Sequence, residues 1–580
     1  MNDQRMADAQ REYDVIVVGS GAGGMTAALC CRAQGLSVVL IEKDRVYGGT
    51  SAVSGGGIWI PCNEQMAAAG VPDSEEEALT YLKHLTGGEV PEEKLIAYVR
   101  GARAMLHFME SRYGVRFRAV AKYPDYFPEA PGGKPGARTM EPVAFDARRL
   151  GAEFFRQREP YRGTLVMGRV SMDQVEAHTL FARGPGWVRL TLKLMGRYWT
   201  DFSWRRKTWR DRRLVLGQSL VAQLRLAMLE NAIPLEYETA LESLVEEDGR
   251  VTGVVAVQGG RRLRLRARRG VILASGGFES NQALREQYLP RPTRAEWTAA
   301  PGCNTGDGLR AGLRLGAATR FMNLTWGAPT VPVPGSAVAT ALFVERSLPG
   351  CVIVNGAGRR FFNEAAPYTE AVYAIYAEQA RSGAAIPCWM VFDARFRKNY
   401  PCGPLLPASL QPDAKLPAEW NGKVYFKADT LQALAKKIGV DAAGLAETVA
   451  NMNRYAAQGR DPEFGKGGNV FDRYYADPKI KPNPCLAPLA QAPYYAMPLY
   501  PGEIGTKGGL LTDAHARVLR EDGRAIPGLY AIGNCSAAVM GRTYAGPGAT
   551  LGPAMTFGYL AAQDLAAARE SATPRAAAAA

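Results

Sequence analysis

A glycine-rich turn between two buried strands constrains this chain more than any other feature. Residues 13–40 read as an apolar strand, a turn, an alanine-rich helix and a second apolar strand. The turn carries Gly19, Gly21 and Gly24 in the pattern GxGxxG, and Glu42 follows the last glycine by 18 residues. Glycine permits a tight turn and close approach of a pyrophosphate to the helix N-terminus, while the carboxylate suits ribose hydroxyls. The pattern predicts a dinucleotide-binding βαβ unit.

Length and composition narrow the class of protein. A chain of 580 residues exceeds one compact core, and 47% hydrophobic with 22% charged residues indicate folded globular domains. No run approaches 18 uncharged apolar residues and the N-terminus lacks an apolar signal core, so we expect neither a membrane span nor secretion. Nine cysteines without a CxxC pair and four histidines predict no metal site and a cytoplasmic protein. The net charge of +14 suits an anionic partner and leaves nucleic acid, a membrane surface and an acidic ligand open.

Changes in composition along the chain indicate its domain organisation. Proline becomes frequent and the glycine pattern is absent in the middle of the chain, whereas the C-terminal block returns to strand, glycine loop and helix. The predicted fold class is α/β, with a Rossmann-like domain assembled from N- and C-terminal parts around an inserted α+β substrate domain. The predicted parts are 1–288 (first part of the dinucleotide domain), 289–491 (substrate domain), 492–569 (second part) and 570–580 (disordered tail).

The dinucleotide motif does not by itself separate NAD from FAD. After Glu42 the sequence continues KDRVYGGTSAVSGGG, and GLYAIGN places a second glycine turn near the other end of the chain. This arrangement resembles the flavoprotein superfamily of succinate dehydrogenase and fumarate reductase, in which the C-terminal segment closes over an extended FAD. The resemblance implies FAD, which we expect to be non-covalently bound. The cofactor-binding residues predicted from the motifs are Gly19, Ser20, Gly21, Ala22, Gly24, Glu42, Lys43, Gly49, Thr50, Ser51, Gly55, Gly56, Gly306, Asp307, Gly533, Asn534, Ala549 and Leu551.

The histidines argue against a small dicarboxylate substrate. Superfamily members that act on fumarate or succinate bind it with histidine and arginine. His84, His107, His178 and His515 lie in segments that resemble none of those motifs, so we expect them at surface or core positions.

Five separated motifs carry a closer resemblance. GGTSAVSGGGIWIP, KYPDYFPEAPGG, NTGDG, FFNEAAPY and TYAGPGAT occur in the order found in the 3-ketosteroid Δ1-dehydrogenase family. The resemblance implies that Tyr544 and the backbone N–H of Gly548 bind the C3 carbonyl. It also implies that Tyr126 and Tyr368 remove a proton from C2 while hydride leaves C1 for the flavin.

The residue types suit that chemistry. Donors aimed at a ketone oxygen stabilise the developing enolate, but a phenol is a poor base at neutral pH, so Tyr368 would need a lowered pKa, with Tyr126 as its hydrogen-bond partner. Tyr373 and Tyr376 lie within eight residues of Tyr368, so the sequence does not decide which of the three tyrosines is the base. Because the chain has 25 tyrosines, an ordinary packed aromatic is the competing interpretation for each of them.

A basic aromatic insert occupies about residues 150–215. Its segment 187–213 holds nine Lys or Arg, two Asp and four tryptophans. This composition suits an anionic membrane or nucleic acid, and a sterol-like substrate favours the membrane. We therefore predict peripheral association with the inner face of the cell membrane and no nucleic-acid partner. The competing interpretation is a helical hairpin packed on the body or in an oligomer interface. The insert resembles a subgroup that includes cholest-4-en-3-one Δ1-dehydrogenases.

The sequence predicts an oxidoreductase acting on a 3-ketosteroid, with a quinone-like or artificial external electron acceptor. Two alternatives keep the fold: a Δ4-(5α)-3-ketosteroid dehydrogenase and another fumarate reductase-like flavoprotein. A non-enzymatic alternative is a membrane-docked carrier of steroid or FAD, which would leave the tyrosines without a purpose.

Overall fold

The computed structural model describes residues 11–567, and its first sheet combines strands from both ends of that range. The sheet order is β20, β21, β11, β1, β2 and β8, and β10 and β9 continue it from β11. Strands β21, β11, β1, β2 and β8 run parallel, whereas β9, β10 and β20 pair antiparallel. The strands are β1 (Arg11–Val18), β2 (Val38–Ile41), β8 (Leu235–Glu236), β9 (Thr239–Glu247), β10 (Arg250–Gln258), β11 (Arg261–Leu273), β20 (Arg517–Leu519) and β21 (Ala525–Ala531).

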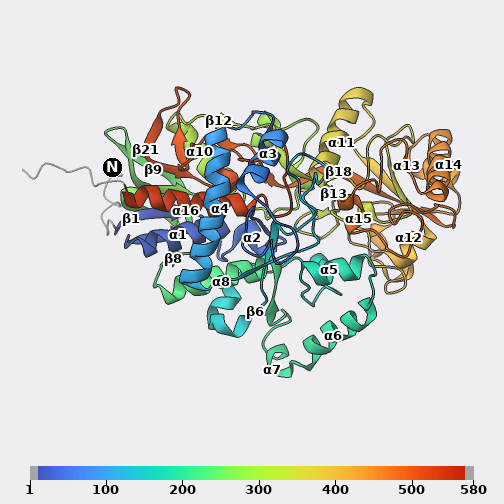
Figure 1. Ribbon diagram of the computed structural model, residues 1–580, viewed down its shortest axis with the longest axis horizontal. Helices are drawn as coiled ribbons and strands as arrows, with labels where there is room; N and C mark the ends of the chain where they lie inside the picture. The colour runs from blue at the N-terminus through green and yellow to red at the C-terminus, as the bar shows by residue number, and fades with distance from the viewer. Residues whose placement is uncertain (1–10, 568–580) are drawn as a thin grey trace, which may run out of the picture.

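Strands β1 and β2 and the end of β11 are buried on both faces of the first sheet, which explains their continuous apolar runs. In β1, Val15 and Val17 join one core cluster while Ile16 and Val18 join another, because successive side chains point to opposite faces. Helices α1 (Ala22–Ala33), α4 (Glu92–Tyr113), α8 (Leu216–Glu230) and α16 (Leu551–Ala567) pack over the first of these faces. Figure 1 shows α16, from the C-terminal end, alongside α1 and α4. The predicted fold class is confirmed.

A second sheet forms the centre of another part of the molecule, on the right in Figure 1. Its order is β14, β13, β18, β16 and β15, and β17 pairs with β18. In β15, Cys351 and Ile353 face one core while Val352 and Val354 face the core beneath α13 (Leu431–Ile438) and α14 (Ala442–Gln458). Helix α11 (Tyr368–Ser382) packs on β13. The strands are β13 (Thr325–Val331), β14 (Thr340–Ala341), β15 (Cys351–Val354), β16 (Cys388–Asp393), β17 (Phe426–Ala428) and β18 (Tyr494–Thr506).

The structure corrects the predicted boundary between residues 491 and 492. Strand β18 lies in the second sheet, between β13 and β16, although the prediction assigned it to the first domain. On β18, Met497 and Ala496 pack into the two cores of the second sheet, one on each side. Its apolar run was compatible with either sheet, so the sequence did not place it. The predicted tail 570–580 lies outside the described residues.

Smaller elements surround the junction of the two sheets. They include a three-stranded sheet, the helices that follow the first glycine loops and the helices of the insert, which form the lowest part of Figure 1. These elements are α2 (Gly49–Val53), α3 (Glu75–Thr86), β3 (Ile58–Trp59), β4 (Phe117–Ala119), β5 (Thr139–Pro142), α5 (Gln174–Phe181), α6 (Trp187–Thr200), α7 (Phe202–Arg205), α10 (Asp307–Arg314) and α15 (Val470–Tyr474). Within residues 11–567, no helix has both the length and the apolar character that crossing a membrane requires.

Candidate active site

The predicted dinucleotide turn connects β1 to α1. Gly19 has a φ of +105°, and a Cβ there would lie 2.5 Å from the carbonyl oxygen of Ala274. A Cβ at Gly24 would lie 2.1 Å from the Gly19 oxygen, so these two glycines are required for close packing. Gly21 differs, because its Cβ would meet a single neighbour, Ser51 Oγ, at 3.5 Å. The turn therefore leaves space at the N-terminus of α1, as a bound pyrophosphate needs.

The carboxylate of Glu42 is fixed beside this turn. Its Oε2 accepts hydrogen bonds from Ser20 N at 3.0 Å and Ser20 Oγ at 2.5 Å, and Oε1 accepts one from Asp44 N at 3.0 Å. Gly48 N donates to Ser20 Oγ at 3.0 Å. Glu42 is thus held at the end of β2, where it fits the ribose of a dinucleotide.

A second group of predicted residues lies beside the turn. Lys43 Nζ is 2.6 Å from Asp307 Oδ2 and 2.8 Å from Thr305 Oγ1. Burial raises the pKa of Asp307, but the hydrogen bond and charge of Lys43, together with hydrogen bonds from Thr305 and Arg310, hold the pKa below its usual value. Thr50 Oγ1 accepts from Asn304 at 2.8 Å. The structure therefore places the NTGDG motif beside the first glycine loops. Lys43 and Asp307 also form an ion pair with each other.

The remaining predicted glycines differ in their surroundings. A Cβ at Gly49 would meet nothing within 4 Å, so space remains above the start of α2. A Cβ at Gly56 would lie 2.3 Å from the backbone of Leu216, and one at Gly55 would lie 3.3 Å from the side chain of Gln174 on α5. The Gly55–Gly56 pair is therefore packed against the insert and the start of α8.

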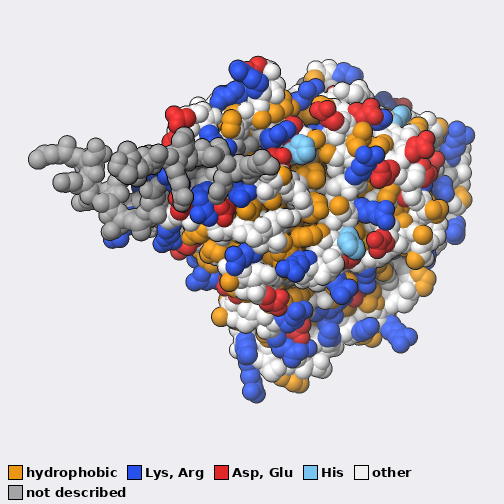
Figure 2. Space-filling view, turned by 60° about the vertical axis from the view of Figure 1, so that its left-hand side comes forward, with side chains coloured by type: hydrophobic (Ala, Val, Ile, Leu, Met, Phe, Trp, Pro, Cys, Tyr) orange, Lys and Arg blue, Asp and Glu red, His pale blue; other side chains and the backbone are white. Residues whose placement is uncertain are grey.

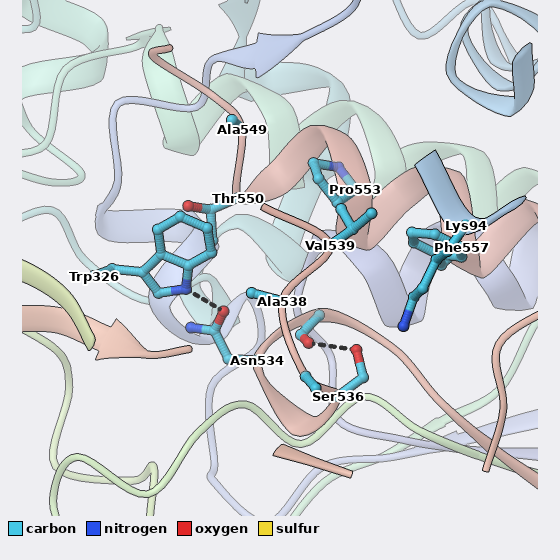
Figure 3. Close-up of a pocket in the computed structure, with 12 residues that line it drawn as sticks. Lys94, Trp326, Asn534, Ser536, Ala538, Val539, Ala549, Thr550, Pro553 and Phe557 are labelled. Carbon is cyan, nitrogen blue, oxygen red and sulfur yellow. Dashed lines mark hydrogen bonds between the residues drawn. The ribbon is translucent and has the colours of Figure 1, made fainter. Parts of the chain in front are cut away.

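A small cavity opens beneath the C-terminal loop, residues 533–550. The predicted residues Gly533, Asn534 and Ala549 line it, and Leu551 begins the helix that follows. Figure 3 shows Trp326 pointing its Nε1 at Asn534 Oδ1, 3.0 Å away. The lining mixes apolar surface with a few polar groups, as the lining of ligand pockets does. Among the residues missed from the sequence, Thr550 stood within a recognised motif, whereas Trp326 on β13 carried no signal.

Three predicted tyrosines meet beside this cavity. Tyr126 follows β4, Tyr368 begins α11 and Tyr544 precedes α16, yet their ring centroids lie 5.0 to 5.6 Å apart with near-perpendicular planes. Tyr544 also packs edge-on against Trp326 at 4.7 Å. We call Tyr126, Tyr368 and Tyr544 the tyrosine cluster.

The three tyrosines of α11 differ in what they contact. Tyr368 contacts both other members of the tyrosine cluster, whereas Tyr373 Oη donates to Arg542 O at 2.6 Å and Tyr376 Oη to Pro292 O at 3.3 Å. The latter two hydroxyls are therefore engaged elsewhere.

Hydrogen bonds and close packing hold the loop between Tyr544 and Gly548 in place. Tyr126 N donates to Ala545 O at 3.1 Å, and Thr139 Oγ1 donates to Pro547 O at 2.9 Å. Gly548 has a φ of +94°, and a Cβ there would lie 2.6 Å from the backbone of Ile58. Thr550 Oγ1 donates to Tyr544 Oη at 3.1 Å, which helps to orient the hydroxyl. The phenol of Tyr544 and the backbone of Gly548 therefore act as neighbouring groups in one rigid loop.

Burial dominates the electrostatics of the tyrosine cluster. It raises the pKa of both Tyr126 and Tyr368 well above the usual value near 10, and neighbouring tyrosines add to the effect. A hydrogen bond with Tyr126 acts in the opposite direction on Tyr368 without overcoming burial. Burial also raises the pKa of Tyr544, although hydrogen bonds from Thr550, Tyr368 and the Gly548 backbone oppose it. The expected lowering of the Tyr368 pKa is therefore wrong for the protein alone, because desolvation of the phenolate is the larger effect.

The histidines lie outside the tyrosine cluster. His84, His107 and His515 are exposed. His178 on α5 stacks on Tyr474 with ring centroids 4.3 Å apart, and its Nε2 lies 2.6 Å from Tyr474 O. Burial lowers the pKa of His178, which favours the neutral ring.

The insert divides its basic and aromatic residues between two environments. Leu194 and Tyr198 on α6 are 1% exposed, and Trp204 is buried with its Nε1 donating to Arg210 O at 2.9 Å. Arg210 is itself buried and donates to Phe154 O and Gln157 O. Composition could not distinguish these packed residues from the solvent-facing ones.

The solvent side of the insert is amphipathic. Val188, Leu192, Trp199 and Phe202 are 50 to 71% exposed. Within residues 188–207, the basic residues that are also exposed are Arg189, Lys193, Arg206 and Lys207. In the lowest part of Figure 2, to which the insert projects in Figure 1, basic side chains surround hydrophobic ones.

The class of protein follows from the family comparison. The model of the FAD binding domain family matches residues 14–551, which covers the glycine turn, Glu42, the tyrosine cluster and most of the cavity lining. The chain therefore belongs to this family of flavoproteins, and its cofactor is FAD. The open Gly21 turn, the fixed carboxylate of Glu42 and the cavity fit that group.

Individual relatives narrow the class. The chain is 44% identical to a 3-oxosteroid 1-dehydrogenase of Mycolicibacterium smegmatis, with 96% of this chain and 98% of that one covered. It is 43% identical to one of Comamonas testosteroni, with 96% and 97% covered. The crystal structure of 3-ketosteroid delta1-dehydrogenase from Sterolibacterium denitrificans in complex with 1,4-androstadiene-3,17-dione superposes with a TM-score of 0.94. It is 54% identical and covers 96% of this chain and 100% of that one. The chain belongs to the 3-oxosteroid 1-dehydrogenase family and is an FAD-dependent oxidoreductase.

Proposed function

We propose that the protein introduces a double bond between C1 and C2 of 3-ketosteroids, converting a 3-oxo-4-ene into a 3-oxo-1,4-diene. The observation that carries the proposal is the convergence of Tyr126, Tyr368 and Tyr544 beside the C-terminal loop. Bound FAD supplies the hydride acceptor. The surrounding aromatic rings suit an apolar substrate, and the buried hydroxyls supply its polar contacts.

In this proposal Tyr544 and the Gly548 N–H bind the C3 carbonyl. Both lie in the loop that hydrogen bonds and close packing hold in place, so their donors stay close together while negative charge develops on the substrate oxygen. Donors of this kind contribute roughly 3 to 4 kcal/mol each to stabilisation of the transition state. Carbonyl binding also acidifies the C2 protons, which reduces what the base must do.

Tyr368 then receives the C2 proton, and Tyr126 hydrogen-bonds to its oxygen. Because burial raises the pKa of both phenols, the reactive phenolate form is scarce at neutral pH. We therefore expect the rate to depend on groups that stabilise negative charge on this pair, and to rise with pH.

Anaerobic titration with 4-en-3-one steroids tests the activity directly. We expect loss of the oxidised flavin absorbance and a product two mass units lighter. A product desaturated at C4 from a 5α-steroid would support the Δ4 alternative instead, because that reaction uses the same clamp and base. Bleaching that fails with every steroid, despite tight binding, would support a carrier.

We further propose that the solvent side of the insert binds an anionic membrane. The supporting observation is the pairing of four exposed apolar side chains with four exposed basic ones in residues 188–207. Each basic residue near such a surface contributes about 1 kcal/mol, and apolar side chains enter the interface. A membrane-docked enzyme would take a poorly soluble steroid from lipid, and a quinone-like acceptor in the same membrane would reoxidise the flavin.

Vesicle flotation tests the membrane proposal. Replacing Arg189, Lys193, Arg206 and Lys207 by Ser should release the protein from anionic vesicles at low salt. The matched control replaces four exposed arginines of β11, Arg261, Arg262, Arg264 and Arg266, and removes the same charge. If both variants lose binding equally, net charge accounts for it and the insert has no specific role. Reduction of long-chain quinones in the same vesicles tests the acceptor.

A further inference from the structure

Arg346 lies buried behind the tyrosine cluster, with 1% of its surface exposed. Its guanidinium donates to four backbone carbonyl groups. Nε contacts Leu342 O at 3.1 Å and Nη2 contacts Phe343 O at 3.2 Å, while Nη1 contacts Glu364 O at 2.6 Å and Ala366 O at 3.1 Å. One side chain thus ties together two segments that are about twenty residues apart in sequence.

Both segments adjoin Tyr368. The Phe343 ring packs edge-on against the Tyr368 ring, with centroids 5.0 Å apart. Ala366 stands two residues before Tyr368, where Pro367 precedes the first turn of α11. Arg346 therefore fixes a neighbour of the Tyr368 ring and also the backbone that carries it.

The positive charge of Arg346 has no ion-pair partner within residues 11–567, since its hydrogen bonds all go to carbonyl groups. Burial lowers its pKa to about 10, so the guanidinium stays protonated at neutral pH. A buried cation without a bonded anion is costly, and such a group calls for an explanation.

Five titratable groups surround Arg346. They are Glu345, Glu364, Cys351, Cys388 and Tyr126. Glu364 is held by Arg360 at 2.7 Å and Lys466 at 3.7 Å. The Glu345 carboxylate accepts the N–H groups of Val344 and Gly403.

Burial raises the pKa of Glu345 and of the two thiols, and the Glu345 carboxylate is bound by backbone N–H groups of its own surroundings. The other ionisable groups that face the pair Tyr126 and Tyr368 are Tyr123 and Tyr544. Burial raises their pKa as well, so neither brings a charge near neutral pH. Arg346 is then the neighbouring group whose charge can stabilise a phenolate of this pair.

We propose that Arg346 is a positioning residue for proton removal: it holds Tyr368 through the carbonyl groups of residues 342–343 and 364–366, and its buried positive charge stabilises the phenolate of the tyrosine pair. The inference rests on the proposed function of Tyr126 and Tyr368. In that step the phenolate oxygen of Tyr368 takes the C2 proton, the C2–H electron pair becomes the new double bond and the C1 hydride passes to FAD. The phenolate must exist before the step, so a nearby cation increases the active fraction.

Stopped-flow reduction of the flavin by a 4-en-3-one steroid, measured from about pH 6 to about pH 10, tests this role. The pH range over which the rate of flavin reduction increases is called the rising limb. In Arg346→Met this limb should lie at a pH higher by about one unit or more, and the rate below it should be roughly tenfold slower. Arg346→Lys keeps the charge but loses part of the carbonyl contacts. Its limb should stay within about half a unit of the wild type while its maximal rate falls.

Arg397 provides a control beside another part of the second sheet. It is also buried and donates to the backbone carbonyls of Leu406 and Gln411, although it additionally pairs with Asp413 at 3.2 Å. Arg397→Met should leave the limb in place. An unmoved limb in Arg346→Met, or an equal shift in Arg397→Met, would overturn the proposal. If Arg346→Met does not fold, Arg346→Lys decides alone, since a shift of a full unit with the charge retained contradicts the charge role.

Wild type and Tyr368→Phe in the same experiment separate the two proposals. A wild type that steroid does not reduce, or a fully active Tyr368→Phe, defeats the proposed function and this inference with it. A failure confined to the Arg346 variants leaves the proposed function intact.

Discussion

The tyrosine cluster and the insert show two ways in which a protein presents aromatic residues. The tyrosine cluster draws Tyr126, Tyr368 and Tyr544 from three distant segments and buries them, whereas the solvent side of the insert comes from one stretch with Leu192 and Phe202 about 70% exposed. A group that depends on convergence is sensitive to each member. A surface whose contacts are distributed should lose little with any single change. Effects of substitution should therefore be steep in the first region and shallow in the second.

Tyr368→Phe should produce the largest loss and so test the steep side of this comparison. Removing the proposed base should slow flavin reduction by about a hundredfold to ten-thousandfold, with FAD content unchanged. Tyr373→Phe, on the same helix, is the control, because its hydroxyl bonds to Arg542 O outside the tyrosine cluster. Stopped-flow measurement on both variants checks the assignment, and a larger loss in Tyr373→Phe would move the base to that residue.

Tyr544→Phe should have the next largest effect. Loss of one carbonyl donor weakens transition-state stabilisation by about 3 kcal/mol, or roughly a hundredfold in turnover. Tyr559→Phe on α16 is the control, since its ring packs on Phe108 with centroids 5.5 Å apart. Turnover and flavin absorbance measured together distinguish a lost donor from a lost cofactor. Normal turnover in Tyr544→Phe would contradict its place in the carbonyl clamp.

The pH dependence of flavin reduction tests the effect of burial on the pKa values of the tyrosines. Because the pKa values of Tyr126 and Tyr368 lie above 10, the phenolate fraction is small at neutral pH and increases with each unit of pH. The rate of flavin reduction should rise by up to about tenfold per pH unit until another step limits it. A flat profile between about pH 6 and about pH 9 would show that a phenolate does not take the proton.

The sequence predicted what depends on motifs and missed what depends on environment. Gly19 and Gly24 were identified because a backbone approach within 3 Å requires glycine, and that requirement is visible as spacing. The raised pKa of Tyr368 was not predictable, since it depends on atoms contributed by other segments. Arg210 counted as one more charge in the insert until the structure placed it beneath Trp204. Composition gives an average over a segment, whereas burial is decided residue by residue.

Two leucines on α6 test the shallow side of the comparison within one helix. Leu192 is 69% exposed and Leu194 is 1% exposed, although they are separated by one residue. Leu192→Ser should leave the melting temperature unchanged and weaken binding to anionic vesicles by up to about tenfold, because one apolar side chain no longer enters the interface. Leu194→Ser should lower the free energy of unfolding by about 2 to 5 kcal/mol, because it removes core contacts and buries a hydroxyl. Vesicle flotation and thermal unfolding of both variants give a crossed pattern if α6 docks through its solvent side. If Leu192→Ser changes neither measurement, Leu192 does not enter the interface, and the contrast between the two leucines reduces to packing alone.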